Sequence, residues 1–274
     1  MNLLMAYPSK EEFALSSLGY MWLYKIANET DGINVTRIST DNCNICSGKI
    51  DAIAFSLSFD FDFYGVFELL DKLNIPFYKN ERGENLPLIF AGGPVITTNP
   101  KPYEDIFDFM IAGDGENCFK EILEIIKTSD SKQNSIKNIR NIDCTIFPDK
   151  KVKKRTDDLK NVIYSPIISE KSYFKNTLVI EIARGCMNRC AFCTASYTNL
   201  PFRNYEYEKI IDILESGLKK TNKLALLGAQ VSAHPQFKEI LKYIRNKIES
   251  GQNIELGISS LRADSIYPEL IQTP

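Results

Sequence analysis

The chain has 274 residues, of which 44% are apolar and 25% are charged, and its formal net charge is −2. These values are typical of folded globular proteins and exclude disordered and fibrous classes, and the near-neutral charge excludes a globally basic nucleic-acid coat. No run reaches the about 20 apolar residues that a membrane span requires, and residues 1–7 lack the basic flank and apolar core of a secretory signal. We therefore expect a cytoplasmic protein.

Strands and helices are predicted to alternate along the first 128 residues. Short apolar runs predict strands at 3–7, 33–38, 52–57, 88–91 and 109–112, and apolar residues at helical spacing predict helices at 10–28, 63–73 and 116–127. This alternation is typical of a parallel sheet with helices on both faces, where ligands bind at the carboxyl ends of the strands. Candidate ligand-binding residues at those ends are Ser56, Gly92 and Gly93. The same glycines also fit tight strand-to-helix turns that bind nothing.

Residues 129–174 have a looser pattern, which predicts a linker. Within it, residues 150–155 read KKVKKR, which places five cations in six positions. Such a run forms either a solvated loop or exposed strand, or a patch that contacts RNA phosphates. No aromatic residue is interleaved to stack on bases, and this favours the solvated segment.

The chain has seven cysteines and a single histidine, His234. An odd number of cysteines in a chain of this size argues against a disulfide framework, and the scarcity of histidine leaves thiolates as the main metal ligands. Cys186, Cys190 and Cys193 follow a predicted strand at 177–182. Because zinc prefers four ligands, three closely spaced thiolates favour an iron–sulfur cluster with one iron open to a non-protein ligand. Structural zinc and unligated thiols are the alternatives.

The Cys186-x3-Cys190-x2-Cys193 pattern, with Phe192 before the third cysteine, resembles the signature of the radical S-adenosylmethionine (SAM) enzymes. The resemblance implies a [4Fe–4S] cluster held by these three cysteines, whose open iron binds the amino and carboxylate groups of SAM. It also implies a low-potential electron donor of the flavodoxin or ferredoxin type, and reductive cleavage of SAM to a 5′-deoxyadenosyl radical. Phe192 is expected near the adenine.

The sequence after the cysteines predicts further βα units. Helices are predicted at 206–219 and 236–249, and strands at 224–227 and 254–258. By resemblance, Gly228, Ala229 and Gln230 occupy the position of the Gly-Gly-Glu motif that receives the amino group of SAM, with Ala229 and Gln230 in place of Gly and Glu. Ser259 and Arg262 follow the next strand, where family members contact the ribose or the carboxylate. Ordinary βα turns are the alternative for both segments.

The layout of the whole chain resembles an uncharacterised group of iron–sulfur oxidoreductases, radical SAM proteins with an N-terminal cobalamin (B12)-binding-like domain. The similarity rests on Ser17-Leu18-Gly19, Ser56-Leu57, Gly92-Gly93-Pro94, Gly113-Asp114-Gly115-Glu116 and Pro201-x-Arg203. The Asp-x-His-x-x-Gly loop of the cobalamin fold is missing. Either cobalamin binds without a protein histidine ligand, or the domain has kept the fold and lost the cofactor, and we favour loss.

The other four cysteines are Cys43, Cys46, Cys118 and Cys144. They do not follow the pattern of methylthiotransferases, which have a similar layout and use three N-terminal cysteines for a second cluster. Two interpretations stay open: Cys43 and Cys46 bind a metal together with Cys118 or Cys144, or all four are incidental thiols, which we favour.

The predicted fold class is therefore α/β. We expect a doubly wound, Rossmann-like and cobalamin-binding-like domain at 1–128, a linker at 129–174, and the first half of a (βα) radical SAM barrel of the TIM type at 175–274. Six units of about 30 residues each would need about 180 residues, so we expect a truncated or split chain.

The predicted function is reductive cleavage of SAM for an unknown substrate, in cobalamin-assisted methylation or in RNA or protein modification. The alternative is a non-catalytic iron–sulfur fragment that needs a partner or a missing C-terminal half.

Overall fold

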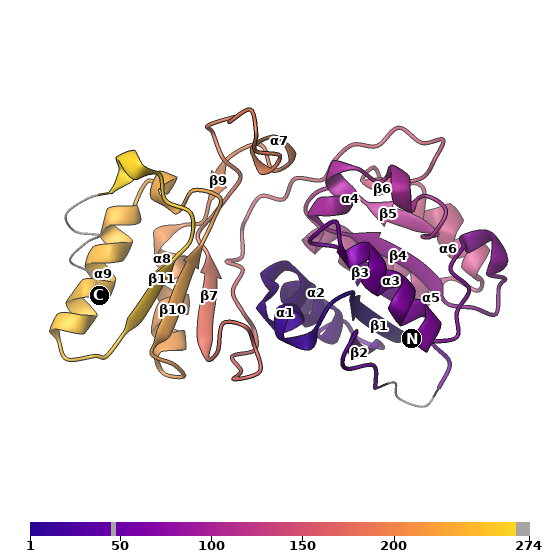
Figure 1. Ribbon diagram of the computed structural model, residues 1–274, viewed down its shortest axis with the longest axis horizontal. Helices are drawn as coiled ribbons and strands as arrows, with labels where there is room; N and C mark the ends of the chain where they lie inside the picture. The colour runs from indigo at the N-terminus through magenta and orange to yellow at the C-terminus, as the bar shows by residue number, and fades with distance from the viewer. Residues whose placement is uncertain (45–47, 267–274) are drawn as a thin grey trace. The chain divides into compact units, whose positions relative to one another are not determined.

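The computed structural model describes residues 1–44 and 48–266. The chain divides into two compact units, Met1–Asp157 and Asp158–Pro274, and each has a parallel sheet of its own (Figure 1). The mixed α/β class with parallel sheets is thus confirmed. Every helix within the described residues is too short or too polar to cross a membrane.

The first unit is built on a six-stranded sheet in the order β2-β1-β3-β4-β5-β6. Its strands are β1 (Asn2–Tyr7), β2 (Asn34–Ser39), β3 (Ala52–Ser56), β4 (Leu88–Gly92), β5 (Phe109–Ile111) and β6 (Thr145–Ile146). Neighbouring strands among the first five are parallel, whereas β6 pairs antiparallel with β5. The five predicted strands are confirmed, and 2-1-3-4-5 is one of the strand orders of doubly wound sheets.

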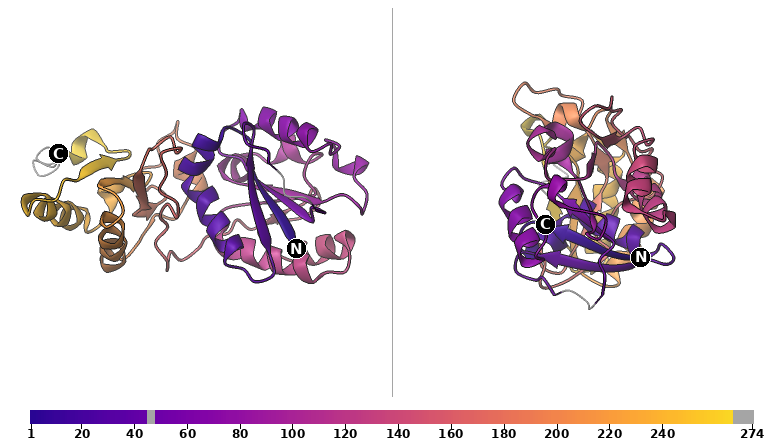
Figure 2. Two further views of the ribbon diagram at one scale, coloured as in Figure 1. Left: turned by 90° about the horizontal axis from the view of Figure 1, so that it is seen from below. Right: turned by 90° about the vertical axis from the view of Figure 1, so that its right-hand side faces the viewer.

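Helices cover both faces of this sheet (Figure 2). They are α1 (Glu11–Ser16), α2 (Leu18–Asn28), α3 (Asp62–Lys72), α4 (Pro94–Thr98), α5 (Glu116–Thr128) and α6 (Lys132–Ile139), with 3-10 turns at Lys79–Glu81 and Lys101–Tyr103. One core cluster joins Leu4, Ala6, Ile53, Phe55, Ile89 and Ala91 of the strands with Val66, Leu69 and Ile96 of α3 and α4. On the other face, Tyr20 of α2 donates a hydrogen bond to the Met5 carbonyl, and Phe119 of α5 contacts Phe90. Burial on both faces explains why these strands are continuous apolar runs.

Two parts of the first unit differ from the sequence prediction. The single helix predicted at 10–28 is divided at Ser17, whose backbone is extended (φ −78°, ψ 101°) and which ends α1 and precedes α2. Apolar spacing cannot reveal this break, because α1 and α2 both contribute buried residues on either side of it. In addition, the segment predicted as a linker contributes α6 and β6 to the first unit.

The candidate residues Ser56, Gly92 and Gly93 lie at the carboxyl ends of the neighbouring strands β3 and β4. Gly93 has a φ of 114°, and a Cβ atom on it would lie 2.3 Å from the carbonyl oxygen of Leu57. No side chain fits this position, because both the backbone conformation and the close contact exclude a Cβ. Local packing alone therefore accounts for this glycine.

We expect Gly93→Ala to lower the free energy of unfolding of the first unit by about 2–4 kcal/mol, because the added Cβ forces the β4–α4 turn apart. The matched control is Gly19→Ala in α2, where the added Cβ has no atom within 4 Å. That variant should be neutral or slightly more stable, since alanine favours a helix. Urea unfolding of both variants measures the difference, and equal stabilities would contradict the assigned packing.

The second unit contains a three-stranded parallel sheet in the order β11-β10-β7. Its elements are β7 (Thr177–Glu181), β8 (Ala183–Arg184), α7 (Ala195–Thr198), β9 (Arg203–Asn204), α8 (Tyr207–Leu218), β10 (Lys223–Leu227), α9 (Phe237–Glu249) and β11 (Glu255–Ile258), with 3-10 turns at Val231–Ala233 and Ala263–Ser265. The predicted strands and helices of this part are confirmed. Within the described residues the sheet is open, and a TIM-type barrel is not confirmed.

Candidate functional site

The three cysteines of the predicted signature lie in one loop of the second unit, residues 185–202, which we call the cysteine loop. It leaves β8 and returns at β9, and these two short strands pair antiparallel with each other. Because β8 follows β7 almost directly, the loop emerges at the carboxyl end of the parallel sheet. This is the edge at which open α/β sheets bind their ligands.

The two ends of the cysteine loop are packed tightly against each other at Gly185. This residue has a φ of 82°, and a Cβ atom on it would lie 2.4 Å from the Asn199 carbonyl oxygen and 2.8 Å from that of Pro201. A glycine is thus required where the loop begins. The cysteines are held in a loop whose ends are fixed.

The three thiols differ in burial and in their hydrogen bonds. Cys186 is buried, and Cys190 and Cys193 are half-buried. A hydrogen bond from the Ser196 hydroxyl lowers the pKa of Cys193, with help from the backbone N–H groups of Ser196 and Ala195. Such donors stabilise the thiolate, which is the form that binds metals.

The donor atoms in the cysteine loop indicate whether the loop suits a single metal ion or an iron–sulfur cluster. Within the residues that the structure describes, no three His, Cys, Asp or Glu side chains converge on a single metal-ion position. A cluster of four irons demands a wider arrangement than one ion, because each thiolate binds a different iron. Three thiolates without a neighbouring imidazole are soft ligands that suit iron–sulfur chemistry.

The predicted Gly-Gly-Glu-like segment lies next to the cysteine loop. Gly228, Ala229 and Gln230 follow β10, and the Gln230 Oε1 atom lies 3.7 Å from the Cys186 Sγ atom. Asn188 Nδ2 donates both to Cys186 Sγ, at 3.4 Å, and to Gln230 Oε1. The structure thus brings together residues that are 44 positions apart in the sequence.

Ser259, at the end of β11, joins this group through Gly228. The Gly228 N–H donates to Ser259 Oγ at 3.1 Å, and the Ser259 hydroxyl donates to the Gly228 carbonyl at 3.0 Å. A Cβ atom on Gly228 would lie only 3.0 Å from the Ala183 carbonyl oxygen. The carboxyl ends of β10 and β11 are therefore linked at the edge that carries the cysteine loop.

Arg262 and Phe192 are the two remaining candidates of the second unit. Arg262 forms a 2.6 Å ion pair with Asp264. This pairing is the main reason why the pKa of Arg262 is raised, and the Cys190 and Cys186 thiolates raise it further. The Phe192 side chain is 90% exposed, so its face is accessible to a planar ligand.

Sequence reasoning missed a side-chain network that joins β7 to both ends of the cysteine loop. Glu181, at the end of β7, accepts two hydrogen bonds from the Arg184 guanidinium, at 2.9 and 2.7 Å, and one from the Tyr205 hydroxyl, at 2.9 Å. Arg184 precedes the loop, and Tyr205 follows β9. An acidic residue in an otherwise apolar strand, with an arginine three positions later, is the signal that could have revealed it.

The only histidine of the sequence, His234, is a structural residue of the second unit. It is buried, its Nδ1 atom accepts a hydrogen bond from the Gln236 N–H at 3.1 Å, and its Nε2 atom lies 2.9 Å from the Tyr205 carbonyl. The neutral tautomer with a proton on Nε2 satisfies both contacts. Both ring nitrogens are thus engaged within the protein.

We expect the second unit to lose stability on mild acidification because of His234. Burial lowers the pKa of His234, so the unfolded chain takes up a proton near pH 6.5 while the folded chain stays neutral until lower pH. The stability is complete above about pH 6.5 and falls as the pH drops from there through the folded pKa. Urea unfolding at pH 7.5 and at pH 5.5 measures this loss, and the loss should be smaller in His234→Asn. An unchanged pH dependence in that variant would contradict the assignment.

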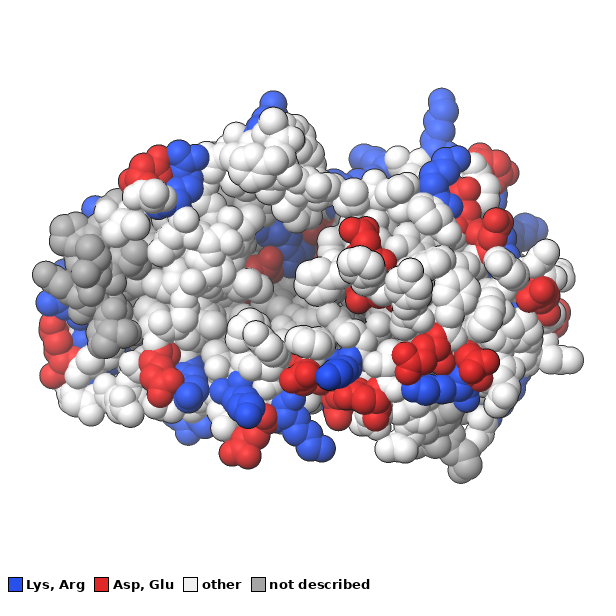
Figure 3. All heavy atoms as spheres, viewed as in Figure 1, with Lys and Arg blue, Asp and Glu red and all other residues white. Residues whose placement is uncertain are grey.

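Two of the five cations in the basic run at 150–155, Lys150 and Arg155, have side-chain partners inside the first unit. Lys150 Nζ donates to Thr145 Oγ1 at 2.8 Å and also to the Ile142 carbonyl, and Arg155 pairs with Asp157 at 3.4 Å. On the face of the molecule shown in Figure 3, Lys and Arg are interspersed with Asp and Glu. These observations favour a structural segment over a phosphate-binding patch.

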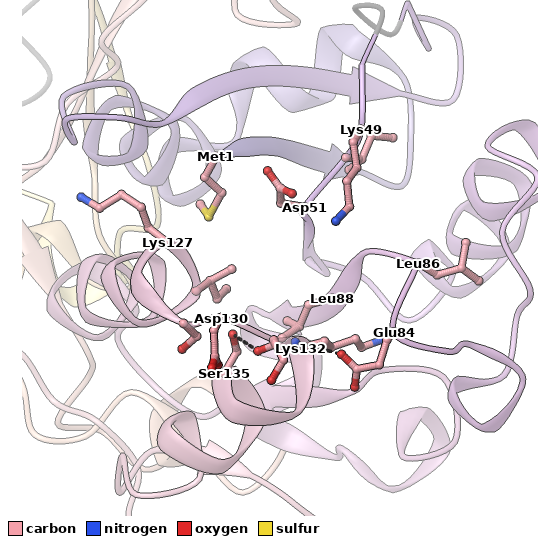
Figure 4. Close-up of a pocket in the computed structure, with 14 residues that line it drawn as sticks. Met1, Lys49, Asp51, Glu84, Leu86, Leu88, Lys127, Asp130, Lys132 and Ser135 are labelled. Atoms are coloured by element: carbon pink, nitrogen blue, oxygen red, sulfur yellow. Dashed lines mark hydrogen bonds between the residues drawn. The ribbon is translucent and has the colours of Figure 1, made fainter.

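A pocket of about 320 Å³ lies at the amino edge of the first unit's sheet (Figure 4). Its charged lining residues are Lys49, Asp51, Glu84, Lys127, Asp130 and Lys132. Lys132 forms a 3.3 Å ion pair with Asp108, and Lys127 a 2.6 Å ion pair with Glu124. Because the charges are of both signs, and because ligands of such sheets bind at the opposite edge, we assign no ligand to this pocket.

Comparison with known proteins agrees with this geometry. Residues 34–148 match the family model described as the N-terminal part of radical SAM proteins, and residues 180–273 match that of the radical SAM superfamily. An uncharacterized protein of Methanocaldococcus jannaschii is 28% identical over 276 residues, which cover 99% of this chain and 57% of that protein. The chain thus spans little more than half the length of this curated relative. The cysteine loop lies inside the second matched region, which assigns this part of the chain to the radical SAM superfamily.

Proposed function

We propose that the chain is an enzyme that holds a [4Fe–4S] cluster on Cys186, Cys190 and Cys193 and uses it to cleave SAM reductively. The observation that carries this proposal is the contact of the cysteine loop with the segment after β10, where Gln230 Oε1 lies 3.7 Å from Cys186 Sγ. In radical SAM proteins these two segments hold the cluster and the amino group of SAM. The bound cluster would supply a low-potential electron that breaks a carbon–sulfur bond of SAM and yields a 5′-deoxyadenosyl radical.

The residues around the cysteine loop have distinct roles in this proposal. The Asn188 amide donates to Cys186 Sγ and so offsets the negative charge of the ligating thiolate. The oxygen of the neutral Gln230 side chain accepts from the ammonium group of SAM, in place of the family's glutamate. Arg262 contacts the carboxylate of SAM through a charge-assisted hydrogen bond, and Phe192 stacks on the adenine.

Backbone groups complete the proposed SAM site. The reciprocal hydrogen bonds between Ser259 and Gly228 fix the turn after β10. With this turn fixed, the backbone of Ala229 is presented toward the ligand in one orientation, which lowers the entropy lost on binding. The electron donor is a low-potential protein of the flavodoxin or ferredoxin type.

Cobalamin is not part of the proposed function. The family model matched by the first unit is described by its place in radical SAM proteins and not as a corrinoid domain. The only histidine in the sequence is buried in the second unit with both ring nitrogens engaged. The residues thus offer no imidazole for cobalt.

The test is the formation of 5′-deoxyadenosine by the anaerobically reconstituted chain with SAM and dithionite. We expect turnover from the wild-type chain and at least about tenfold less from Gln230→Ala, because the ammonium group of SAM loses its acceptor. Gln236→Ala is the matched control, because the Gln236 side chain is exposed and only its backbone N–H is used by His234. A chain with a full cluster and no 5′-deoxyadenosine would overturn the enzyme assignment and support a non-catalytic iron–sulfur fragment.

A further inference from the structure

Two cysteines of the first unit, Cys118 and Cys144, contact each other in its interior. Their Sγ atoms are 2.9 Å apart, although the residues are 26 positions apart in the sequence. Cys118 lies in the first turn of α5, and Cys144 directly precedes β6. Their exposed fractions are 0% and 1%. The sulfurs are closer than two unbonded sulfur atoms normally approach, so a short movement brings them to bonding distance.

The backbones on both sides of this contact are fixed by the fold. The Cys144 carbonyl accepts a hydrogen bond from the Ala112 N–H at 2.9 Å, which extends the pairing of β5 with β6. Phe119, next to Cys118, packs on Phe90 of the sheet. The two thiols are therefore held together by the sheet and by α5, and do not meet by a chance rotation of surface side chains.

The charges near the pair make one of the two thiols the better nucleophile. The hydrogen-bonded contact with the Cys118 sulfur, together with the nearby Arg155 and Lys150 cations, lowers the pKa of Cys144. The pKa of Cys118 is raised by the same hydrogen bond and by burial. Such an asymmetric pair is the usual arrangement of cysteines that exchange with disulfides, since the thiolate is the attacking species.

We propose that Cys118 and Cys144 form a redox-active site, a dithiol that closes to an intramolecular disulfide on exchange with a small-molecule disulfide. The Cys144 thiolate attacks one sulfur of the oxidant and releases one thiol as leaving group. The Cys118 thiolate then attacks Cys144 Sγ in the mixed disulfide and releases the second thiol. One S–S bond forms and one breaks, the protein dithiol loses two electrons and two protons, and the oxidant is reduced to two thiols.

The closed bond would join α5 to β6 beside the turn at 113–116. Gly113 forms a backbone bridge with Arg155, and the Asp114 N–H donates to the Arg155 carbonyl at 3.1 Å. The disulfide would thus fasten the start of α5 at the carboxyl edge of the sheet. Because both sulfurs are buried, oxidation and reduction both require local opening of the unit, and both should be slow while it stays folded.

The test uses the full chain, purified under anaerobic and reducing conditions and then incubated with oxidised glutathione. After an acid quench, free thiols are blocked with N-ethylmaleimide in denaturant, and linked peptides are identified by mass spectrometry. We expect the Cys118–Cys144 linkage to dominate over all other pairs. The unfolding midpoint of the first unit should rise by roughly 5–10 °C, since the crosslink restricts the unfolded chain.

Cys118→Ser and Cys144→Ser are the matched controls, and both should lose the linked peptide and the rise in midpoint. A sample refolded from denaturant in the same glutathione mixture tests whether burial alone blocks the reaction. If Cys118 and Cys144 are alkylated as free thiols in both the folded and the refolded samples, the proposal is wrong. A random distribution of linkages that includes Cys43 and Cys46 would also overturn it.

Discussion

Replacing Cys186, Cys190 and Cys193 together by alanine should abolish cluster assembly. Anaerobic reconstitution of the wild-type chain should give about four irons and four sulfides per chain, with a brown absorbance near ~400 nm, because three thiolates and an open iron complete such a cluster. The triple variant should bind iron only at background level. Iron and sulfide analysis with absorption spectra measures the loss, and circular dichroism checks that the variant is folded.

The matched control for this experiment is the double variant Cys43→Ala/Cys46→Ala. It tests the other cysteine pair of the sequence, of which Cys46 lies outside the described residues. We expect it to keep its full cluster, because Cys43 packs against the core of the first unit. A triple variant that still assembles four irons, or a double variant that assembles none, would show that the ligands are assigned wrongly.

Glu181→Ala should cause a large loss of stability near the cysteine loop. Glu181 and Arg184 have only 13% and 14% of their side chains exposed, so removal of the carboxylate takes two charge-assisted hydrogen bonds from the guanidinium in a largely dry environment. We expect the free energy of unfolding of the second unit to fall by about 3 kcal/mol. The cluster should also dissociate faster from the reconstituted variant, because Glu181 holds both Arg184 and Tyr205.

Two further variants separate this network from an ordinary surface ion pair. Glu249→Ala removes an exposed pair with Arg245 in α9, in which 59% of the Glu249 side chain is accessible, and should cost about 0.5 kcal/mol. Tyr205→Phe removes a single hydrogen bond to Glu181 and should cost about 1 kcal/mol. Chemical denaturation ranks the three variants, and a Glu181→Ala effect no larger than that of Glu249→Ala would refute the role of the network.

The sequence predicts the regular elements well, because their signals are local. Buried parallel strands such as β3 and β4 are continuous apolar runs, and α5 and α9 carry a clear apolar stripe. The break at Ser17 and the two-residue strands β6, β8 and β9 could not be predicted. Their positions depend on pairing with distant segments, which no local periodicity records.

For the candidate site, the sequence supplies the candidate residues but not the contacts between them. The three cysteines are proposed as ligands from their spacing, and Gln230 as a SAM-binding residue from a resemblance to a motif, and the structure places Gln230 beside Cys186. The contacts of Asn188 with Gln230, and of Glu181 with Tyr205, join residues 42 and 24 positions apart. Such contacts form only when the βα topology of the second unit and the path of its loops bring these residues together. No local sequence pattern predicts them.

The paired strands β8 and β9 have a thermodynamic consequence for cofactor binding. Their main-chain pairing holds the two ends of the cysteine loop together independently of the thiols. The conformational entropy of closing that loop is therefore lost when the chain folds, and only the interior of the loop remains to be ordered when iron and sulfide bind. For a cluster bound as proposed, affinity would thus depend on main-chain pairing at Ala183 and Asn204 as well as on the thiols, and residues that never touch iron would set how long it stays bound.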